Sequence, residues 1–214
     1  LQPAIVSFPM KVAPSILAYS TVLLIAATCY AADPLEVKLF DNMARMLSVS
    51  PDGKLLAVAE EGPAIALVQV PGGEIVYRLE GHTERVHSVH CSPDGKTLVS
   101  GGYDKTVRLW STESGNLLRT VTAIGDVADA RFSPDGSLIA VSYLSSQDLQ
   151  ILDPHSLEEV RRVVSPLAPP TDPSNLKARI AFSPDGSLLV VAYGGRSWPQ
   201  YTGDDSTITI LGTG

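Results

Sequence analysis

The chain has 214 residues, of which 44% are hydrophobic and 18% charged, enough apolar sequence to bury a sizeable core. From Asp33 onward it carries 23 acidic and 15 basic residues, a net charge of −8, with no cluster of Arg or Lys interleaved with aromatic residues. Such a surface repels phosphate backbones, which excludes nucleic acid as a partner. After the first 32 residues, short Val, Leu and Ile blocks alternate with Gly, Pro, Asp and Ser, a pattern typical of strands and turns.

The first 32 residues are not expected to be part of the fold. We interpret residues 1–9 as upstream or cloning sequence and residues 10–32 as a signal peptide that starts at Met10 and is cleaved after Ala31. Its apolar run, Val12–Ala27, is about 16 residues, shorter than the roughly 20 that span a bilayer. An uncleaved membrane anchor is the alternative, and a lipid anchor on Cys29 is a weaker one. Membrane contact is expected only through such an anchor.

Export agrees with the cysteine count. Once the signal is removed, only Cys91 remains, so the mature chain forms no internal disulfide, which suits a bacterial periplasm or cell exterior. His87 and His90 precede this cysteine. On a regular strand His87 and Cys91 face one side and His90 the other, so these three side chains do not converge on a metal. We expect neither a metal nor a cofactor.

Four copies of the tetrapeptide Ser-Pro-Asp-Gly divide the rest of the chain. Pro fixes φ for a type I turn, and Gly supplies the left-handed conformation that returns the chain to the ladder. Each copy is therefore predicted to be the hairpin between the first and second strands of a repeat. Repeats of about 40 to 45 residues with four strands each are typical of β-propellers. The four copies are Ser50–Gly53, Ser92–Gly95, Ser133–Gly136 and Ser183–Gly186.

We therefore predict an all-β fold over residues 33–214: a β-propeller of four-stranded antiparallel blades in an incomplete ring. The repeats run over about residues 43–80, 81–122, 123–165 and 178–214, which gives about three and a half blades. The count indicates a fragment of a longer propeller. Ahead of the first repeat, Leu35–Phe40 is expected to be the outer strand that completes the last blade of the ring, or otherwise an edge strand of the first.

The second repeat resembles the WD-repeat family. It begins with Gly81-His82 and ends with Ser-Gly-Gly-Tyr-Asp-Lys-Thr-Val-Arg-Leu-Trp, in which Trp110 is followed by Ser111 instead of Asp. The resemblance implies a buried hydrogen-bonded chain of His82, Asp104, Ser100 and Trp110, with a structural and not a catalytic role. The other repeats have Val or Leu at the Ser100 and Trp110 positions, which predicts apolar packing in its place. The third repeat is also similar to bacterial extracytoplasmic propellers related to lactonases.

Two long connections are the best candidates for partner binding. Ser165–Lys177 joins the third repeat to the fourth, and Gly194–Ser206 interrupts the fourth between its second and third strands. Such connections open on the same face of a propeller, so both are expected to line one rim. Arg196, Trp198 and Tyr201 are residue types enriched at interface anchors. A solvated loop tip remains the alternative for each of them.

These features favour an exported scaffold that binds other proteins or sibling domains, with no catalysis by this segment. The sequence contains no nucleophile elbow, metal-ligand spacing or phosphate-binding glycine loop. The alternative is part of a lactonase-like or quinone-dependent exported enzyme with its catalytic groups at the central channel. In this segment the channel candidates are His82, His87, Asp104 and Asp126. Whether the full-length protein is an enzyme stays open.

Overall fold

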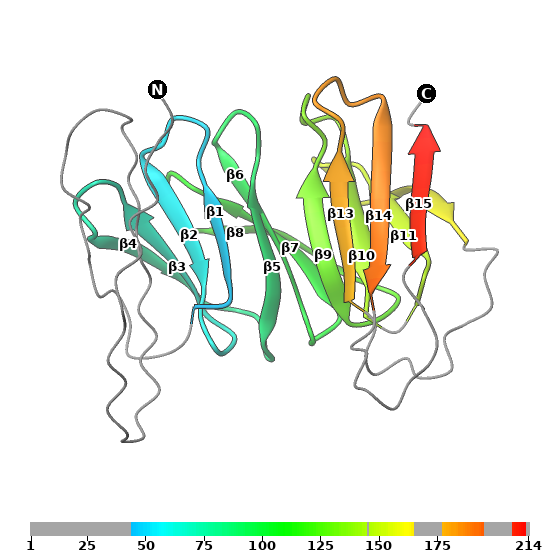
Figure 1. Cartoon of the computed structure of the whole chain (residues 1–214). Coiled ribbons are helices and arrows are strands. Elements are labelled where there is room, and N and C mark those ends of the chain that lie inside the picture. The colour runs from blue at the N-terminus through cyan, green and yellow to red at the C-terminus, as the bar shows by residue number, and fades with distance from the viewer. Residues whose placement is uncertain (1–43, 145, 165–176, 195–206, 213–214) are drawn as a thin grey trace, which may run out of the picture.

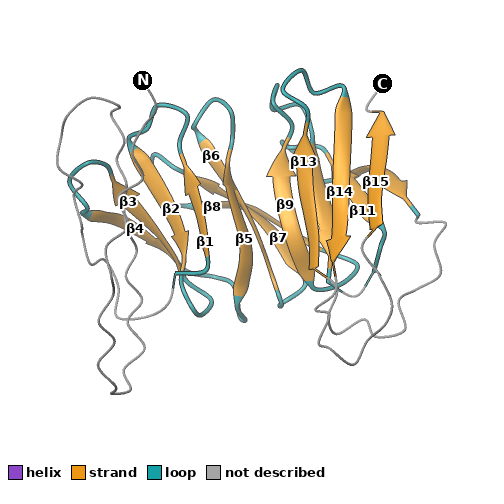
Figure 2. Cartoon of the chain, in the orientation of Figure 1, coloured by secondary structure: helices purple, strands orange, loops and turns teal. Residues whose placement is uncertain are grey.

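The computed structural model describes residues 44–144, 146–164, 177–194 and 207–212. Within these ranges the regular secondary structure consists entirely of β-strands, arranged in four separate antiparallel sheets that follow one another along the chain (Figures 1 and 2). The sheets form an open arc, from the cyan sheet at one end of Figure 1 to the orange and red sheet at the other. The prediction of an all-β, incomplete propeller is confirmed.

Each sheet is one blade, with its strands hydrogen-bonded in chain order. The first three blades have four strands and the fourth has three, β13-β14-β15, among the residues that the structure describes. Blade 1 consists of β1 (Met46–Val49), β2 (Leu55–Ala59), β3 (Ile65–Gln69) and β4 (Ile75–Leu79). Blade 2 consists of β5 (Val86–Cys91), β6 (Thr97–Gly102), β7 (Thr106–Ser111) and β8 (Leu117–Thr122). Blade 3 consists of β9 (Val127–Phe132), β10 (Ile139–Tyr143), β11 (Leu149–Leu152) and β12 (Glu159–Val163). Blade 4 consists of β13 (Lys177–Phe182), β14 (Leu188–Gly194) and β15 (Thr207–Gly212).

The Ser-Pro-Asp-Gly turns close the hairpin between the first two strands of every blade, as predicted. In the first copy, the Ser50 hydroxyl donates to Asp52 Oδ1 over 2.6 Å and accepts the N–H of Leu55 over 2.9 Å. Gly53 has a φ of 71°, in the left-handed region that favours glycine. The other copies repeat these contacts. Because the Ser hydroxyl and nearby amides donate to the carboxylate, the pKa of Asp135 and of Asp185 falls to about 2.

The core lies between the blades, where the sheets pack face to face. Trp110 of blade 2 is buried against the apolar face of blade 1, together with Ile65 and Leu67. Tyr143 and Phe132 of blade 3 pack in the same way against blade 2. A smaller cluster of Ala, Leu, Ile and Val joins blade 3 to blade 4. Each blade therefore depends on its neighbours to bury its faces, as expected for radially stacked sheets.

Gly101 of blade 2 lies directly against Val127 of blade 3. A Cβ atom on Gly101 would lie 2.3 Å from Cγ1 of Val127. We expect Gly101→Ala to lower the free energy of unfolding by about 1–3 kcal/mol, because the extra methyl group overpacks this contact. Urea denaturation measures the effect. Adding Val127→Ala should recover part of the loss, and a double variant no more stable than Gly101→Ala would contradict the assignment.

No helix in the described ranges is long and apolar enough to cross a membrane. The predicted signal peptide and the Leu35–Phe40 strand lie outside the described residues. So do most of the two long connections, which leave only their end residues in the structure.

Candidate functional site

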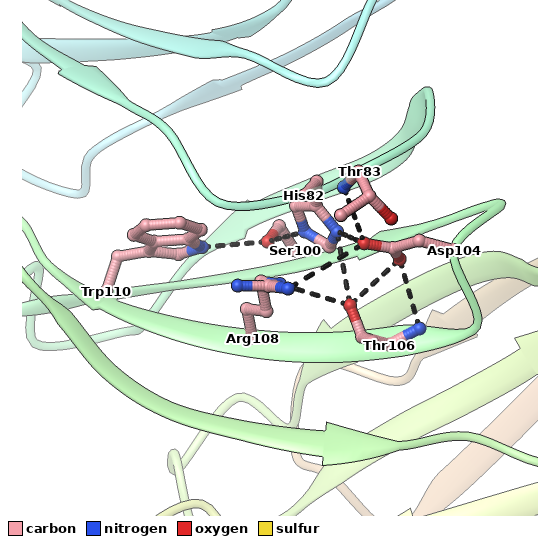
Figure 3. Close-up of polar contacts among 7 residues, drawn as sticks. All are labelled: His82, Thr83, Ser100, Asp104, Thr106, Arg108 and Trp110. Atoms are coloured by element: carbon pink, nitrogen blue, oxygen red, sulfur yellow. Dashed lines mark hydrogen bonds and ion pairs between the residues drawn. The ribbon is translucent and has the colours of Figure 1, made fainter.

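The four residues of the family-like motif meet inside blade 2 (Figure 3). His82 lies in the connection before β5, Ser100 on β6, Asp104 in the turn between β6 and β7, and Trp110 on β7. The His82 Nδ1 atom lies 2.8 Å from Asp104 Oδ2, and Nε2 lies 2.7 Å from Ser100 Oγ. The Trp110 indole N–H donates to Ser100 Oγ over 2.8 Å. One continuous hydrogen-bonded chain therefore crosses the blade from Trp110 to Asp104.

The donors and acceptors of this chain fix the protonation of His82. The indole N–H can only donate and an ionised carboxylate can only accept. A neutral imidazole with its proton on Nδ1 satisfies both ends: Nδ1–H donates to Asp104, and Nε2 accepts the Ser100 hydroxyl proton. Ser100 Oγ then accepts from Trp110. Every polar group in the chain has a partner in this arrangement, which makes a buried network stabilising.

Asp104 gathers further donors around its carboxylate. Oδ2 accepts the backbone N–H of Thr83 over 3.1 Å. Oδ1 accepts the Thr106 hydroxyl over 2.8 Å and the Thr106 N–H over 3.1 Å. The Arg108 Nε–H donates to the Thr106 hydroxyl, and the guanidinium lies 3.9 Å from Asp104 Oδ2. These contacts tie the connection before β5 and the β6–β7 turn to one carboxylate.

Burial and charge support a neutral imidazole beside an ionised carboxylate. Burial lowers the pKa of His82, and the Asp104 charge only partly offsets this effect. Burial alone would raise the pKa of Asp104, but His82 and the Thr106 hydroxyl lower it more, so its pKa stays below the usual value. The side chains of His82 and Asp104 are 0% and 3% exposed. The four residues thus form a closed internal network, not a cleft with a free nucleophile.

The partner-binding candidates Arg196, Trp198 and Tyr201 lie outside the described residues. Of the channel candidates, His87 places Nδ1 2.9 Å from the carbonyl oxygen of Ala128 in blade 3, and its ring meets Tyr103 edge-on. The backbone carbonyl of Asp126 accepts the N–H of Leu144. Among the described residues, no group of three or more His, Cys, Asp or Glu side chains is arranged to hold a metal.

The predicted orientation of His87 is wrong. His87 and His90 both contact blade 3, at Ala128 and Phe132, whereas the thiol of Cys91 lies against Ser48 of blade 1. The reason is an irregularity in register between Val86 and Ser88, where β5 carries an extra residue opposite β6. A bulge of this kind reverses the alternation of side chains on one side of it. The pattern of apolar residues in β5 gave no sign of it.

Sequence reasoning also missed a second polar chain, in blade 3. The Tyr143 hydroxyl donates to Gln150 Oε1, and Gln150 Nε2 donates to Glu159 Oε2 over 2.6 Å. Arg162 completes the chain by donating to the same carboxylate oxygen over 2.6 Å. Tyr143 is fully buried, and this burial raises the pKa of its hydroxyl. Blade 3 is therefore not purely apolar. It has apolar residues at the Ser100 and Trp110 positions of the family motif, and a polar chain at other positions.

His90 makes stability depend on pH. Its Nδ1 atom accepts the N–H of Phe132 over 3.4 Å. Burial, followed by the nearby Arg131 charge, lowers the pKa of His90 from 6.5 to about 4, against the opposing effect of Asp129. Between these two values the unfolded chain binds a proton that the folded chain does not bind. The free energy of unfolding is therefore highest above pH 6.5 and falls as the pH drops toward 4, by about 2 kcal/mol at about pH 5 from His90 alone.

Urea denaturation at several pH values tests this expectation. The control is His90→Asn, which keeps an acceptor for Phe132 but does not titrate. The variant should lose less stability on acidification than the parent chain. Equal losses in the two proteins would show that His90 is protonated equally in the folded and unfolded states.

Comparison with known proteins places this site in a family repeat. Residues 73–111, which contain all four residues of the buried chain, match the family model "WD domain, G-beta repeat". This chain contains a WD40 repeat. The matched range contains the four strands β4, β5, β6 and β7. It begins just before β4 and ends at Ser111, the last residue of β7.

Similar proteins include a WD repeat-containing protein, a U3 small nucleolar RNA-associated protein and a ribosome biogenesis protein. A WD repeat-containing protein of Synechocystis sp. is 42% identical over 93 residues, which is 42% of this chain and 26% of that protein. U3 small nucleolar RNA-associated protein 21 of Saccharomyces cerevisiae is 27% identical over 97 residues, 45% of this chain and 10% of that protein. The BOP1 homolog of Monosiga brevicollis, a ribosome biogenesis protein, is 41% identical over 71 residues, 32% of this chain and 9% of that protein. The matched part of this chain thus spans about a quarter or less of each relative. WD repeats suggest a protein-interaction scaffold, and proteins built from them are typically not catalytic.

Proposed function

We propose that this chain is part of an exported protein-interaction scaffold, which holds a partner protein or a sibling domain on its rim and carries out no catalysis in this segment. The observation that carries the proposal is the internal pairing of the motif side chains. The polar side-chain atoms of His82, Ser100 and Asp104 form hydrogen bonds with each other, with Trp110 and with the backbone N–H of Thr83. Groups that are paired and buried in this way stabilise a blade and do not reach a substrate.

Contacts between charged and aromatic side chains near the connections from second to third strands support the rim proposal. Arg45, just before β1, pairs with Glu61 in the β2–β3 connection over 2.7 Å. Arg85, just before β5, lies 3.8 Å from the same carboxylate and stacks over Tyr103 at 5.8 Å from the ring centroid. Arginine and tyrosine side chains therefore lie near the connections from second to third strands, and these two residue types are enriched at protein interfaces.

Arg196 and Trp198 extend this surface in the proposal. They belong to the connection between β14 and β15, which is the same type of connection as those that hold Glu61 and Tyr103. Propeller topology puts these connections at one end of the blades, and the Ser-Pro-Asp-Gly turns at the other. The proposed binding rim is therefore the end opposite those turns.

Cross-linking and affinity capture with the whole natural protein test the rim. We expect Arg196→Ala with Trp198→Ala to reduce capture of the partner about tenfold or more, because aromatic and Arg anchors dominate interface energies. The matched control is Lys54→Ala with Lys96→Ala, which removes two charges next to the turns at the other end. Equal capture by all three proteins would contradict the rim proposal, and loss only in the control would move the interface to the opposite end.

Export and a larger protein are the remaining parts of the proposal. The basic start and apolar run of residues 10–32 support export, and the length of the matched relatives supports a longer propeller. Fractionation of the natural host tests the first part. Recovery of the processed protein outside the cytoplasmic membrane is expected, and recovery of the unprocessed protein with the cytosol would contradict it.

A further inference from the structure

Hydrogen bonds from backbone amides to side chains join the first strands of neighbouring blades. These strands, β1, β5, β9 and β13, lie on the concave side of the arc (Figure 1). Four residues before its Ser-Pro-Asp-Gly turn, blade 2 has Ser88, whose Oγ accepts the N–H of Ala130 in blade 3 over 2.9 Å. At the same position blade 3 has Asp129, whose Oδ2 accepts the N–H of Ile180 in blade 4 over 3.1 Å. A side-chain oxygen at this position therefore ties a blade to the next one.

Blade 1 has a sulfur atom at this position instead of an oxygen. The residue four positions before its turn is Met46, and a thioether sulfur is only a weak acceptor. Ser48, two residues farther along β1, accepts the N–H of Cys91 in blade 2 over 3.0 Å. The position that carries an oxygen in blades 2 and 3 is thus occupied in blade 1 by a group that gains an oxygen only on oxidation.

A strong donor lies beside this sulfur. Nη1 of Arg179, on β13 of blade 4, is 3.6 Å from Met46 Sδ, and the contact is open to solvent. Met46 is partly buried against the apolar cluster between blades 1 and 2, so its side chain is held in place next to the guanidinium. Among the described residues, no carboxylate pairs with Arg179. The guanidinium therefore contacts an acceptor that is too weak to bind it well.

We propose that Met46 is a site of reversible oxidation, and that its sulfoxide binds the Arg179 guanidinium and fastens blade 1 to blade 4 across the concave side. The sulfoxide oxygen is a strong acceptor, and a guanidinium N–H that donates to it forms a charge-assisted hydrogen bond. Oxidation of methionine usually disrupts a protein because it places a polar group in an apolar core. Here the new oxygen would meet a charged donor at a solvent-exposed contact, so the opposite effect on stability is expected.

The oxidant in this proposal is a hydroperoxide such as hydrogen peroxide. A lone pair of the Met46 sulfur attacks the terminal peroxide oxygen, so that an S–O bond forms as the O–O bond breaks. The proton of the transferred hydroxyl group moves to the departing oxygen, which leaves as water. The sulfur is oxidised and the peroxide is reduced by one electron pair. Methionine sulfoxide reductases reverse the change.

Peptide mass spectrometry after treatment with hydrogen peroxide gives the first test. Trypsin separates Met43, in residues 39–45, from Met46, in residues 46–54. We expect the peptide 46–54 from the folded chain to gain an oxygen atom, and a methionine sulfoxide reductase to remove it. If the folded chain left Met46 unmodified at a peroxide concentration that oxidises it in the urea-unfolded chain, the proposal would be overturned.

Urea denaturation before and after oxidation gives the second test. The background is Met10→Leu with Met43→Leu, which leaves Met46 as the sole methionine of the chain. Oxidation should raise the ratio of folded to unfolded protein about fivefold, as expected for one added hydrogen bond. Arg179→Ala in the same background should abolish this gain. A loss of stability on oxidation, or a gain of equal size in Arg179→Ala, would overturn the proposal.

Two substitutions at Met46 repeat the test without peroxide. Met46→Gln supplies an amide oxygen at a similar distance from the backbone, whereas Met46→Leu has a similar size and no acceptor. The stability of the Gln variant relative to the Leu variant should fall when Arg179→Ala is added, because the guanidinium that the Gln oxygen binds is then missing. An unchanged difference between the two variants would show that an oxygen at this position does not bind Arg179.

Discussion

Replacing Trp110 by alanine is expected to lower the free energy of unfolding by about 3–5 kcal/mol. Trp110 is 1% exposed and packs against Ile65, Leu67 and Leu79 of blade 1, so its removal leaves a large cavity between two blades. It also leaves Ser100 Oγ without the indole donor, in a site where the hydroxyl is fully buried. Urea denaturation followed by circular dichroism measures the change.

Trp110→Phe separates packing from hydrogen bonding. The phenyl ring keeps most of the buried area but has no N–H group, so this variant should lose about 1–2 kcal/mol. Ser100→Ala in the Trp110→Phe background should then cost less than Ser100→Ala in the parent chain, because the two residues share a hydrogen bond. If Trp110→Phe were as damaging as Trp110→Ala, the bond to Ser100 and not the packing would dominate.

Asp129→Ala should also lower the free energy of unfolding by about 3–5 kcal/mol, through the loss of one buried carboxylate that holds three blades together. Asp129 is 1% exposed. Its Oδ1 accepts the Ser88 hydroxyl of blade 2 over 2.9 Å, and its Oδ2 accepts the Ile180 N–H of blade 4 over 3.1 Å. Oδ2 also accepts Nε–H of Arg131 over 3.0 Å. Removing the carboxylate leaves the Ile180 amide buried without its acceptor, and leaves the Ser88 hydroxyl only its longer bond to the Ala130 carbonyl oxygen, 3.3 Å.

Arg131→Ala is the control for Asp129→Ala, because it removes the ion pair and leaves the bonds to Ser88 and Ile180. The Arg131 side chain is 35% exposed and donates only to this carboxylate among the described residues, so its loss should cost less than the loss of the carboxylate. Hydrogen exchange at Ile180 should speed up in Asp129→Ala and stay near the parent rate in Arg131→Ala. Equal destabilisation by the two substitutions would show that the ion pair, and not the link between blades, carries the stability.

The strands of blade 2 could be predicted nearly residue by residue because local chemistry determines them. Ser92, Asp94 and Gly95 form a turn whose hydrogen bonds are all within six residues, so the hairpin and its register follow from the tetrapeptide. The buried chain from His82 to Trp110 was implied only by family resemblance. Its members lie up to 28 residues apart, and no local pattern joins them, although the structure brings them together.

Contacts between blades could not be predicted, because they depend on register. Ser88 and Asp129 are unremarkable residues in apolar strands, yet the stacking of β5 and β9 brings them within hydrogen-bonding distance. The bulge at Val86–Ser88 turned His87 toward blade 3, and a single extra residue leaves no signature in an alternating pattern. The Tyr143–Gln150 bond was missed for a related reason: its residues come from neighbouring strands, and no local pattern joins them.

The direction of the amide-to-side-chain bonds has a consequence for biosynthesis. Ser48, Ser88, His90 and Asp129 each belong to the blade that is made first, and the amides they receive belong to the blade made next. A finished blade therefore already holds the side chains that accept these backbone amides when the next blade is made. The blades can therefore assemble one sheet at a time, in the order in which the polypeptide is synthesised.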